Sequence, residues 1–221
     1  MITHVVFDFD GTLADSKEAF IGLYNAFAEK NHYGKMTAEN LDALRKLSVL
    51  ERCRQLGVPP YKLPWVMMQV GRSFRNAVQS IDFHEGIPEL LKELRGRGLK
   101  LMILSTNSEE NIRAFLKRHA VEAWVEGFYC SSSIFGKARL LRELMKRAGL
   151  QREQLVYVGD EHRDVEACKE VGVKVIAVRW GFDAEVRLRE AGPDHLAERP
   201  AEIIECVGRW STKPPLGAGG A

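Results

Sequence analysis

The sequence predicts an α/β fold in which a doubly wound parallel sheet carries an inserted α-helical subdomain. Short and almost continuously apolar segments recur along the chain, as expected for strands that are buried on both faces of a parallel sheet. Segments with apolar residues at helical spacing separate the later strands, which is the alternation typical of βαβ units. A third observation is a helical stretch between the first two strands that is far longer than a crossover connection requires.

Four apolar segments predict the central strands of the sheet, and two further segments complete it. The four span residues 2–9, 99–104, 155–158 and 173–178, and each is rich in β-branched or aromatic residues. A fifth strand is expected between Trp124 and Ser131, and residues 194–196 predict a short edge strand. Strands that alternate with helices in this way pair in parallel.

Residues 15–82 interrupt this alternation after the first strand. Apolar residues recur there at helical spacing, as at Phe20, Leu23, Tyr24 and Phe27. We therefore expect a helical cap (residues 15–82) inserted into an α/β core of residues 1–14 and 83–210. The hinges between them are expected near residues 14–17 and 81–86.

Three helices are predicted between the later strands of the core. Their ranges are 87–97, 108–118 and 138–148. Pro88 is well placed in the first turn of the first helix, because a missing backbone N–H costs nothing there. Ser108 is expected to cap the second helix, and Gly149 to end the third. Residues 211–221 contain two prolines and three glycines and predict a disordered tail.

The composition excludes several classes of partner. The chain has 221 residues, is 45% hydrophobic and 28% charged, and has a formal net charge of +2. That charge is too small to indicate a nucleic-acid partner, and no apolar run approaches the roughly 20 residues of a membrane span. Four widely spaced cysteines form no CxxC pair and predict free thiols in a reducing compartment. We expect a cytoplasmic protein, either a monomer or a homodimer.

Polar residues capable of catalysis follow three of the predicted strands. Asp8 and Asp10 follow the first strand, Ser105 follows the second, and Asp160 and Asp164 follow the third of the long apolar segments. In open α/β sheets the carboxyl ends of the strands form the active site, so these groups are expected to meet.

The electrostatics of that cluster predict a bound cation. Two carboxylates 4 Å apart repel each other by about 4 kcal/mol at an effective dielectric of 20, so several together need a counter-ion. Oxygen ligands of this kind favour Mg²⁺. A metal alone does not explain the nearby glycine, hydroxyl and lysine groups at Gly11, Ser105 and Lys137, whereas a phosphate group does, because its oxygens require hydrogen-bond donors and positive charge.

Each of these features has an ordinary structural interpretation when it stands alone. An Asp-x-Asp pair is usually a turn or capping feature, residues 105–107 can cap the following helix, and Lys137 can be a solvated helix residue. The functional interpretation depends on all of them occurring in one chain, in a fixed order, at the expected ends of their elements.

In this combination the sequence resembles the phosphatase branch of the haloacid dehalogenase (HAD) superfamily, with a small helical cap after the first strand. The resemblance covers about residues 2–207. It rests on residues 8–16 as the first motif, Ser105 as the second, Lys137 in 135–137 as the third, and 159–164 as the fourth. It implies a Rossmann-like core and a Mg²⁺-dependent enzyme.

The chemistry and the resemblance assign a role to each site residue. Asp8 is the expected nucleophile, because an aspartate is ordinarily ionised at pH 7 and needs no separate base. Asp10 is the expected general acid and base. The resemblance implies that Ser105 and Lys137 complete the catalytic set. The expected substrate-binding residues are Gly11, Thr106, Asn107 and Arg45, and the expected metal ligands are Asp8, Asp10 (through its backbone carbonyl), Asp160 and Asp164, with Glu161 as a further candidate.

The expected substrate is a small phosphorylated metabolite. Arg45, or alternatively Arg52, could meet a second anionic group, although both are equally well explained as surface residues of a helix. Residues 180–183 resemble a loop of phosphoglycolate phosphatases, which makes phosphoglycolate the best single candidate. The alternatives are a phosphosugar mutase of the β-phosphoglucomutase type and a catalytically idle binding protein. The second aspartate, Asp10, argues against a dehalogenase, because a halide leaves without protonation.

Overall fold

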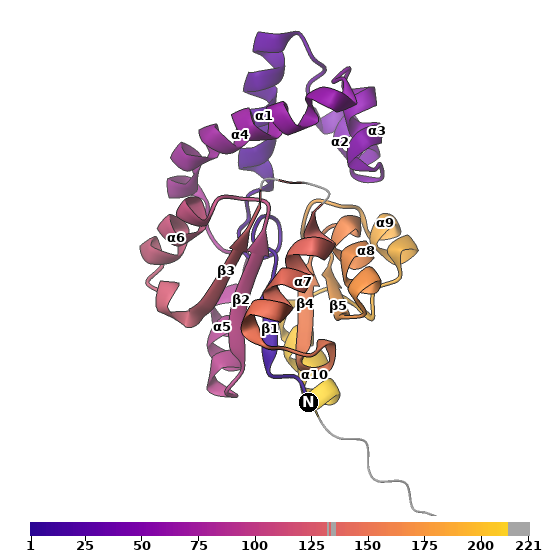
Figure 1. Ribbon diagram of the computed structural model, residues 1–221. Coiled ribbons are helices and arrows are strands. Elements are labelled where there is room, and N and C mark those ends of the chain that lie inside the picture. The colour runs from indigo at the N-terminus through magenta and orange to yellow at the C-terminus, as the bar shows by residue number, and fades with distance from the viewer. Residues whose placement is uncertain (132, 134–135, 212–221) are drawn as a thin grey trace, which may run out of the picture.

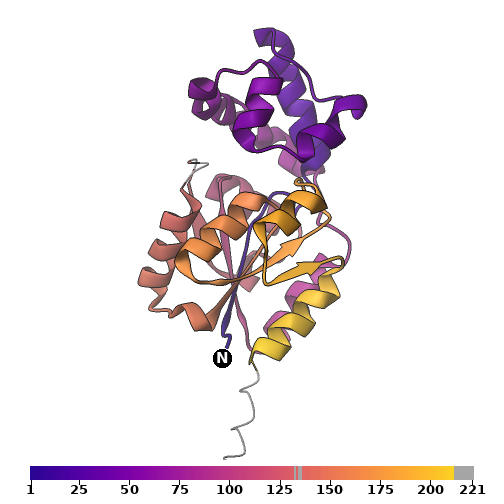
Figure 2. The same ribbon diagram turned by 90° about the vertical axis from the view of Figure 1, so that its right-hand side faces the viewer.

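The computed structural model describes residues 1–131, 133 and 136–211. It has an α/β core of three layers, with a parallel sheet between two layers of helices (Figure 1). A group of helices from the early part of the chain stands above one end of the sheet, and the view turned by 90° shows the same separation (Figure 2). The predicted fold class is confirmed, including a helical insertion after the first strand.

All neighbouring strands of the sheet are parallel, and their order is β3-β2-β1-β4-β5-β6. The strands are β1 (His4–Phe7), β2 (Lys100–Ser105), β3 (Val125–Cys130), β4 (Leu155–Gly159), β5 (Lys174–Val178) and β6 (His195–Ala197). Each lies within about two residues of a predicted segment. β1 is shorter than the apolar run 2–9, because the chain turns after Asp8 and Leu13 N–H and Ala14 N–H both bond the carbonyl of Phe9.

Alternate residues of the strands face the two helix layers, as the pleat requires. Val5 and Phe7 pack in one hydrophobic cluster, and Val6 packs in the other. The first cluster includes residues of α5 (Ile87–Gly96), α6 (Glu109–Arg118) and α10 (Pro200–Ser211), and the second includes residues of α7 (Lys137–Ala148), α8 (His162–Val171) and α9 (Glu185–Ala191). The strands are thus buried on both faces, which explains their continuous hydrophobicity.

The local features that predicted these helices are present in the structure. The Ser108 side chain caps α6 by accepting a hydrogen bond from Asn111 N–H. Gly149 ends α7 with a φ of 66°, in the left-handed region that favours glycine. Pro88 lies in the first turn of α5. Two single turns of 3₁₀ helix, η3 (Glu122–Trp124) and η4 (Arg152–Gln154), lead into β3 and β4.

The insertion forms a small helical unit with a hydrophobic core of its own. It consists of α1 (Lys17–Asn31), α2 (Ala38–Arg45), α3 (Val49–Gln55), η1 (Pro60–Lys62), α4 (Leu63–Ala77) and η2 (Val78–Ser80). The segments that join it to the sheet run side by side: Asp15 N–H bonds Asp82 C=O at 2.9 Å, and Ala14 and Phe83 form an antiparallel bridge. We keep the name cap for residues 15–82, whose exact limits stay a prediction.

Two other expectations concern the chain as a whole. Among the described residues, no helix is both long and apolar enough to span a membrane. All four cysteines are free thiols. The predicted tail begins at Ser211, which is the last residue of α10, and residues 212–221 lie outside the described part of the chain.

Candidate active site

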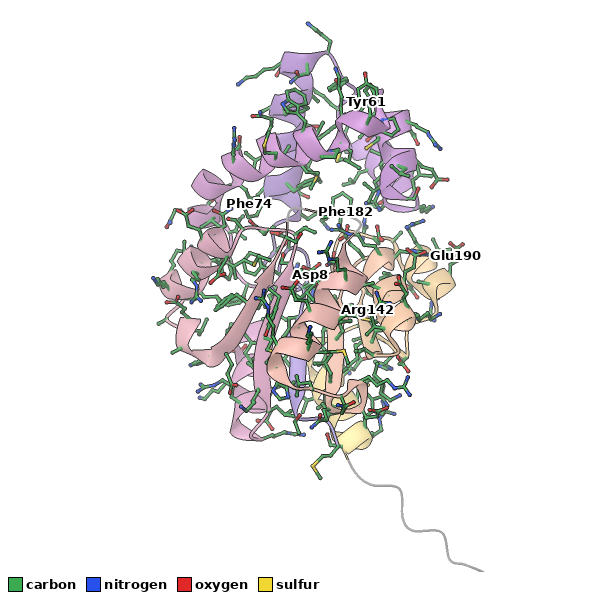
Figure 3. The ribbon with its side chains drawn as sticks, viewed as in Figure 1. Asp8, Tyr61, Phe74, Arg142, Phe182 and Glu190 are labelled. Atoms are coloured by element: carbon green, nitrogen blue, oxygen red, sulfur yellow. The ribbon has the colours of Figure 1, made fainter. Side chains whose placement is uncertain are left out.

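The sheet order brings the predicted site residues together. β1 lies between β2 and β4, and the chain continues from β1 to one side and then returns to the other. A crevice forms at such a switch point, beyond the carboxyl ends of the strands. Figure 3 shows Asp8 there, at the end of the sheet beneath the cap, with Phe182 between the two.

Three buried carboxylates form the centre of the site. Ligand-capable oxygen atoms of Asp8, Asp160 and Asp164 all lie within 4.8 Å of one another. Their residues are 3%, 0% and 0% exposed, so water cannot screen the mutual repulsion. Oxygen-only donors at this spacing match the requirements of a hard divalent cation, and the cluster therefore fits a metal site.

Asp160 is the most tightly enclosed of the three. Thr12 Oγ1 donates to its Oδ1 at 2.8 Å, and the backbone N–H of Phe182 donates to its Oδ2 at 2.7 Å. A Cβ atom on either Gly11 or Gly181 would overlap the side chain of Asp160. Burial, followed by the charges of Glu161 and Asp8, raises the pKa of Asp160 well above its ordinary value. The protein thus holds this carboxyl where its negative charge is costly without a counter-ion.

Lys137 supplies positive charge to the cluster. It is the first residue of α7, is 4% exposed, and its Nζ pairs with Oδ2 of Asp8 and with Oδ1 of Asp164. Burial acts to lower the pKa of Lys137, but the charges of Asp164 and Asp8 outweigh it and raise that pKa above its ordinary value. The ammonium group therefore stays charged, and residue 137 lies where the prediction placed it.

Asp164, like Asp160, has protein partners on both oxygens, but one of its partners is the ammonium group of Lys137. Tyr157 Oη donates to its Oδ1 at 3.2 Å, the same oxygen that pairs with Lys137, and Glu161 N–H donates to its Oδ2 at 3.1 Å. These contacts make Asp164 the residue that orients Lys137. Glu161 pairs with Arg163, whose charge holds the pKa of Glu161 below its ordinary value although burial acts to raise it.

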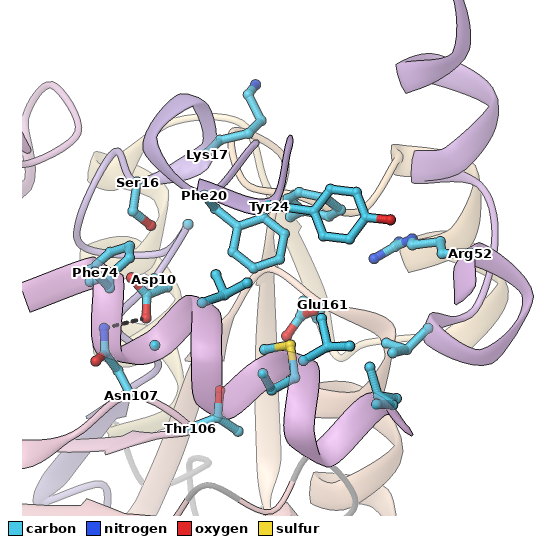
Figure 4. Close-up of a pocket in the computed structure, with 18 of the residues that line it drawn as sticks. Asp10, Ser16, Lys17, Phe20, Tyr24, Arg52, Phe74, Thr106, Asn107 and Glu161 are labelled. Atoms are coloured by element: carbon cyan, nitrogen blue, oxygen red, sulfur yellow. Dashed lines mark hydrogen bonds between the residues drawn. The ribbon is translucent and has the colours of Figure 1, made fainter. Parts of the chain in front are cut away.

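Asp10 lies beside the cluster and has an unusual environment. Burial and the charge of Asp8 raise the pKa of Asp10 to about 7, although a hydrogen bond from Asn107 acts to lower it. Asn107 Nδ2 donates to Oδ2 of Asp10 at 2.9 Å (Figure 4). The other carboxyl oxygen of Asp10, Oδ1, is buried and has no hydrogen-bond partner among the described residues. The carboxyl group of Asp10 is not part of the cluster formed by Asp8, Asp160 and Asp164. The expected contact of the Asp10 backbone carbonyl with a metal stays a prediction.

The residues at and directly after the end of β2 do not all line the pocket. Ser105 is 1% exposed, and its Oγ accepts a hydrogen bond from Asn107 N–H at 3.1 Å. Thr106 and Asn107 line the pocket together with Asp10, whereas Ser105, a predicted catalytic residue, does not. Asn107 therefore contacts a predicted catalytic residue, and Ser108, not Asn107, caps α6.

A pocket with a volume of about 200 Å³ extends from the carboxylates into the cap. Asp8, Asp10, Gly11 and Asp160 line its floor. Its far side consists of side chains of the cap, several of which are drawn in Figure 4.

The two arginines predicted to face the substrate do not occupy equivalent places. Arg52 lines the pocket, and Arg45 is not among the lining residues. Arg45 Nε donates to the carbonyl of Phe182 at 2.8 Å, and its Nη2 donates to that of Gly181 at 3.2 Å. Its guanidinium group therefore binds the backbone of the loop after β5, because three carbonyls of that loop point toward it.

Arg52 links the cap to the same loop. Its guanidinium group pairs with the carboxylate of Asp183, and both residues are buried. The Arg52 guanidinium carbon also lies 4.8 Å from the centre of the Phe182 ring. We call Arg45, Arg52 and residues 181–184 the latch. The sequence does not indicate that Asp183 is the partner of Arg52, because no local pattern connects positions so far apart.

The chain is similar over most of its length to known proteins. A family model described as haloacid dehalogenase-like hydrolase matches residues 5–178. A phosphoglycolate phosphatase from Synechococcus elongatus is 36% identical over 203 residues, which cover 92% of this chain and 96% of the relative. The pyrophosphatase PpaX of Halalkalibacterium halodurans is 24% identical over 212 residues, which cover 94% of this chain and 97% of the relative.

Solved structures share the fold at lower identity. A haloacid dehalogenase-like hydrolase from Streptococcus pneumoniae has a TM-score of 0.78 and 22% identity, with coverage of 93% of this chain and 98% of that one. A predicted phosphatase from Clostridium acetobutylicum has a TM-score of 0.81 and 17% identity, with coverage of 95% and 99%. These likenesses support the fold and do not extend to substrate.

Proposed function

This chain belongs to the haloacid dehalogenase-like hydrolase family, and on that premise we propose that it is a phosphatase that hydrolyses small phosphate monoesters through a covalent intermediate on Asp8. The observation that carries the proposal is the buried group of Asp8, Asp160, Asp164 and Lys137, of which Asp8 and Asp160 line the floor of a pocket. Carboxylates, an ammonium group and a neighbouring acid are the groups that phosphoryl transfer through an aspartate requires.

In the first half of the reaction, Asp8 is the nucleophile. A carboxylate oxygen of Asp8 forms a bond to phosphorus while the bond between phosphorus and the alcohol oxygen breaks. Lys137 Nζ, paired with Oδ2 of Asp8, lies where it can neutralise charge on the transferring group. Asp10 gives its proton to the departing alcohol oxygen, which a carboxyl with a pKa of about 7 can do near neutral pH.

In the second half, water cleaves the phosphoryl-aspartate. Asp10, now a carboxylate, accepts a proton from the attacking water, whose oxygen bonds to phosphorus while the bond to Asp8 breaks. The products are inorganic phosphate and the original carboxylate. The Asn107 amide on Oδ2 of Asp10 fixes the orientation of this group for both steps, since it bonds only one of the two oxygens.

We assign Mg²⁺ to the carboxylate cluster. Asp8 and Asp160 would hold it, because both line the pocket, whereas Asp164 does not and pairs with Lys137 and Tyr157. A bound Mg²⁺ supplies charge neutralisation for the carboxylates and for the phosphoryl oxygens. The family and the three-aspartate cluster support this assignment.

Phosphoglycolate is the first ester to test, because the relative at 36% identity is named as a phosphatase of that compound. Phosphate release with water as the only acceptor also separates the proposal from a phosphosugar mutase, which would require a sugar bisphosphate. No observation in the structure favours the mutase.

The decisive experiment compares the wild type with Asp8→Asn and with Asp42→Asn, in which an exposed carboxylate of α2 is neutralised. Released phosphate is measured with Mg²⁺ over a panel of monoesters that includes phosphoglycolate and p-nitrophenyl phosphate. We expect Asp8→Asn to lower kcat by at least about 10⁴-fold while its thermal unfolding stays cooperative, and Asp42→Asn to keep activity within about threefold of wild type. Normal turnover by Asp8→Asn would refute the mechanism.

A further inference from the structure

The far side of the pocket is almost entirely apolar. Side chains from α1, α3, α4 and the loops between them converge there, as Figure 4 shows for Phe20, Tyr24 and Phe74. The apolar lining residues are Phe20, Tyr24, Met36, Val49, Cys53, Leu56, Val58, Leu63, Val66, Met67, Val70 and Phe74. The pocket therefore has two different halves: a charged floor in the core and a hydrocarbon wall in the cap.

The polar side chains that line the pocket beside this wall, including Arg163 from α8 of the core, already have partners within the protein. Tyr24 Oη donates to the carbonyl of Gly34 at 3.0 Å. The Arg52 guanidinium pairs with Asp183 and also bonds backbone carbonyls of the cap, and Arg163 pairs with Glu161. A second anionic group placed among these side chains would displace an existing ion pair or stay without a partner, and both are unfavourable.

Lys17 lies at the edge of the pocket and does not change this conclusion. It is the first residue of α1 and is among the lining residues. In Figure 4 its ammonium end points away from Asp10 and Phe20. It can add positive charge near the phosphate, but it does not face the hydrocarbon wall.

The size of the pocket suits a ring or a branched chain. An apolar cavity of roughly 150 Å³ is enough to bind benzene. The pocket here has about 200 Å³, part of it above the carboxylates where a phosphate would lie. Met36 and Met67 in the wall are flexible and polarisable, and such side chains adapt to the outline of an apolar ligand.

We propose that the cap half of the pocket is an apolar leaving-group subsite, and that the enzyme prefers phosphate monoesters whose alcohol carries an aromatic or branched hydrocarbon body. This inference rests on the proposed phosphatase function and specifies the substrate class of the same site. It places phosphoglycolate, whose leaving group ends in a carboxylate, among the poorer substrates.

The test uses two esters with matched chemistry, ethyl phosphate and 2-phenylethyl phosphate. Both release a primary alcohol, so their intrinsic reactivity is similar and the ratio of their kcat/KM values reports the contribution of the phenyl ring. We expect 2-phenylethyl phosphate to be favoured by about tenfold to a hundredfold, as burial of a ring of that area predicts. Phosphoglycolate should be no better than ethyl phosphate. A ratio near one, or a preference for phosphoglycolate, would overturn the inference.

A pair of variants on α4 tests the location of the subsite. Val66 is buried and lines the pocket, whereas Met68 on the same helix is 42% exposed and does not. Val66→Phe should fill part of the pocket and lower the preference for 2-phenylethyl phosphate by at least fivefold, whereas Met68→Phe should leave it unchanged. If Val66→Phe stabilises the fold and the preference stays the same, the space is a packing defect of the cap and the inference is wrong.

A binding measurement separates failure of this inference from failure of the proposed function. 2-Phenylethylphosphonate and ethylphosphonate cannot be hydrolysed, so their dissociation constants from the wild-type protein with Mg²⁺ are independent of turnover. At least tenfold tighter binding of the phenyl compound supports the subsite even if no ester is hydrolysed. Equal binding refutes the subsite even if the protein proves to be an active phosphatase.

Discussion

The position of the Asp160 side chain depends on two neighbouring glycines that have no side chain of their own. Gly11 and Gly181 lie on either side of its carboxyl group, and neither position leaves room for a Cβ atom. Gly11 also has a φ of 75°, which other residues adopt at a cost. The absence of two side chains, one from the β1 turn and one from the loop after β5, therefore fixes where the carboxyl oxygens of Asp160, the proposed metal ligands, can lie.

We therefore expect Gly181→Ala to lower activity and stability more than the addition of one methyl group usually does. The added methyl group must displace the Asp160 side chain, so the variant should lose at least tenfold in kcat/KM and about 1–3 kcal/mol in the free energy of unfolding. Gly22→Ala is the matched control, because nothing lies within 4 Å of a Cβ at that helical position. It should gain about 0.5–1 kcal/mol in urea unfolding and keep full activity. Equal effects of the two substitutions would contradict this account.

Asp10 is expected to act in both half-reactions, but its importance depends on the leaving group. Asp10→Asn should lower the turnover of an alkyl phosphate by about 10²–10⁴-fold, because the alkoxide then leaves without a proton. p-Nitrophenolate is a good leaving group and departs without protonation, so with p-nitrophenyl phosphate the first step should stay fast. Hydrolysis of the phosphoryl-aspartate should then become the rate-limiting step. Stopped-flow measurements should then show a burst of p-nitrophenolate close to the enzyme concentration.

The absence of that burst, together with equal losses for both esters, would show that Asp10 has another role. The Asp8→Asn variant provides the blank for the same measurement, since it cannot form the intermediate.

Single residues also mark the limit of what the sequence predicts. Asp8, Asp160 and Lys137 lie at the ends of recognisable elements, so the topology of the sheet brings them together without further information. Arg45 ends α2 and Arg52 lies in α3, and only the folded chain decides that Arg52 lines the pocket while Arg45 binds loop carbonyls. No local pattern distinguishes these two fates.

At the scale of elements, the latch joins two regions that the sequence presents as unrelated. The α2–α3 part of the cap supplies Arg45 and Arg52, and the loop after β5 supplies Asp183. Asp183 Oδ2 in turn accepts a hydrogen bond from His162 N–H at 2.7 Å, at the start of the helix that follows Asp160. The ion pair between Arg52 of the cap and Asp183 is thus connected, through the hydrogen bond to His162, to the segment that carries Asp160 of the carboxylate cluster.

Breaking the buried pair of the latch should be costly, since it leaves the Asp183 carboxylate with only a longer pairing to Arg187, at 3.6 Å. We expect Arg52→Met to lose about 3–5 kcal/mol in the free energy of unfolding, and Arg52→Met with Asp183→Asn to lose less than the sum of the two single variants. The control is Arg97→Met, which removes an exposed pair with Glu93 and should cost at most about 1 kcal/mol. Similar losses in urea titrations of Arg52→Met and Arg97→Met would rule out a structural role for the pair.

The boundaries of the elements were predictable where a single residue enforces them. Ser108 begins α6 through its side-chain hydrogen bond, and Gly149 ends α7 through its positive φ. The end of β1 was not predictable, because Phe9 is as apolar as a strand residue and is buried after the chain has left the sheet. Hydrophobicity indicates burial, and it does not indicate which hydrogen bonds a buried residue makes.

At the scale of the whole molecule, the acidic cluster should couple metal binding to folding. A cation that binds the folded state at a hundred times its dissociation constant adds about 2.7 kcal/mol to the stability. For a chain of this length, that corresponds to a rise in Tm of about 5–10 °C on adding saturating Mg²⁺, and removal with a chelator should reverse it.

Asp160→Asn tests whether this rise in Tm depends on the carboxylate cluster. Asp42→Asn is the control, because the side chain of Asp42 is 89% exposed. Asp160→Asn should lose most of the Mg²⁺-dependent rise in Tm, whereas Asp42→Asn should keep it. Without Mg²⁺, the Tm of Asp160→Asn should equal or exceed that of the wild type, because one repulsive charge has been removed from the cluster. An undiminished rise in Asp160→Asn would place the metal elsewhere.

The architecture of the core was predictable from the sequence, and the pocket was not. Continuous apolar strands and intervening helices determine a parallel sheet almost by themselves. In the cap, however, the residues that only form its core and the residues that line the pocket share one helical periodicity, as Ala28 and the pocket-lining Tyr24 of α1 illustrate. The periodic pattern shows that these side chains avoid water, but it cannot show whether they avoid it against protein or against a ligand.

The latch has a kinetic consequence as well. The chain passes between the core and the cap near the Asp15–Asp82 backbone pair, and the Arg52–Asp183 ion pair is a second connection, which any swing of the cap must break. Every kilocalorie per mole in the latch makes the swung-out population about fivefold rarer at equilibrium. For a bulky alcohol that exchanges only in that population, the frequency of these excursions sets a ceiling on kcat that faster chemistry at Asp8 cannot raise.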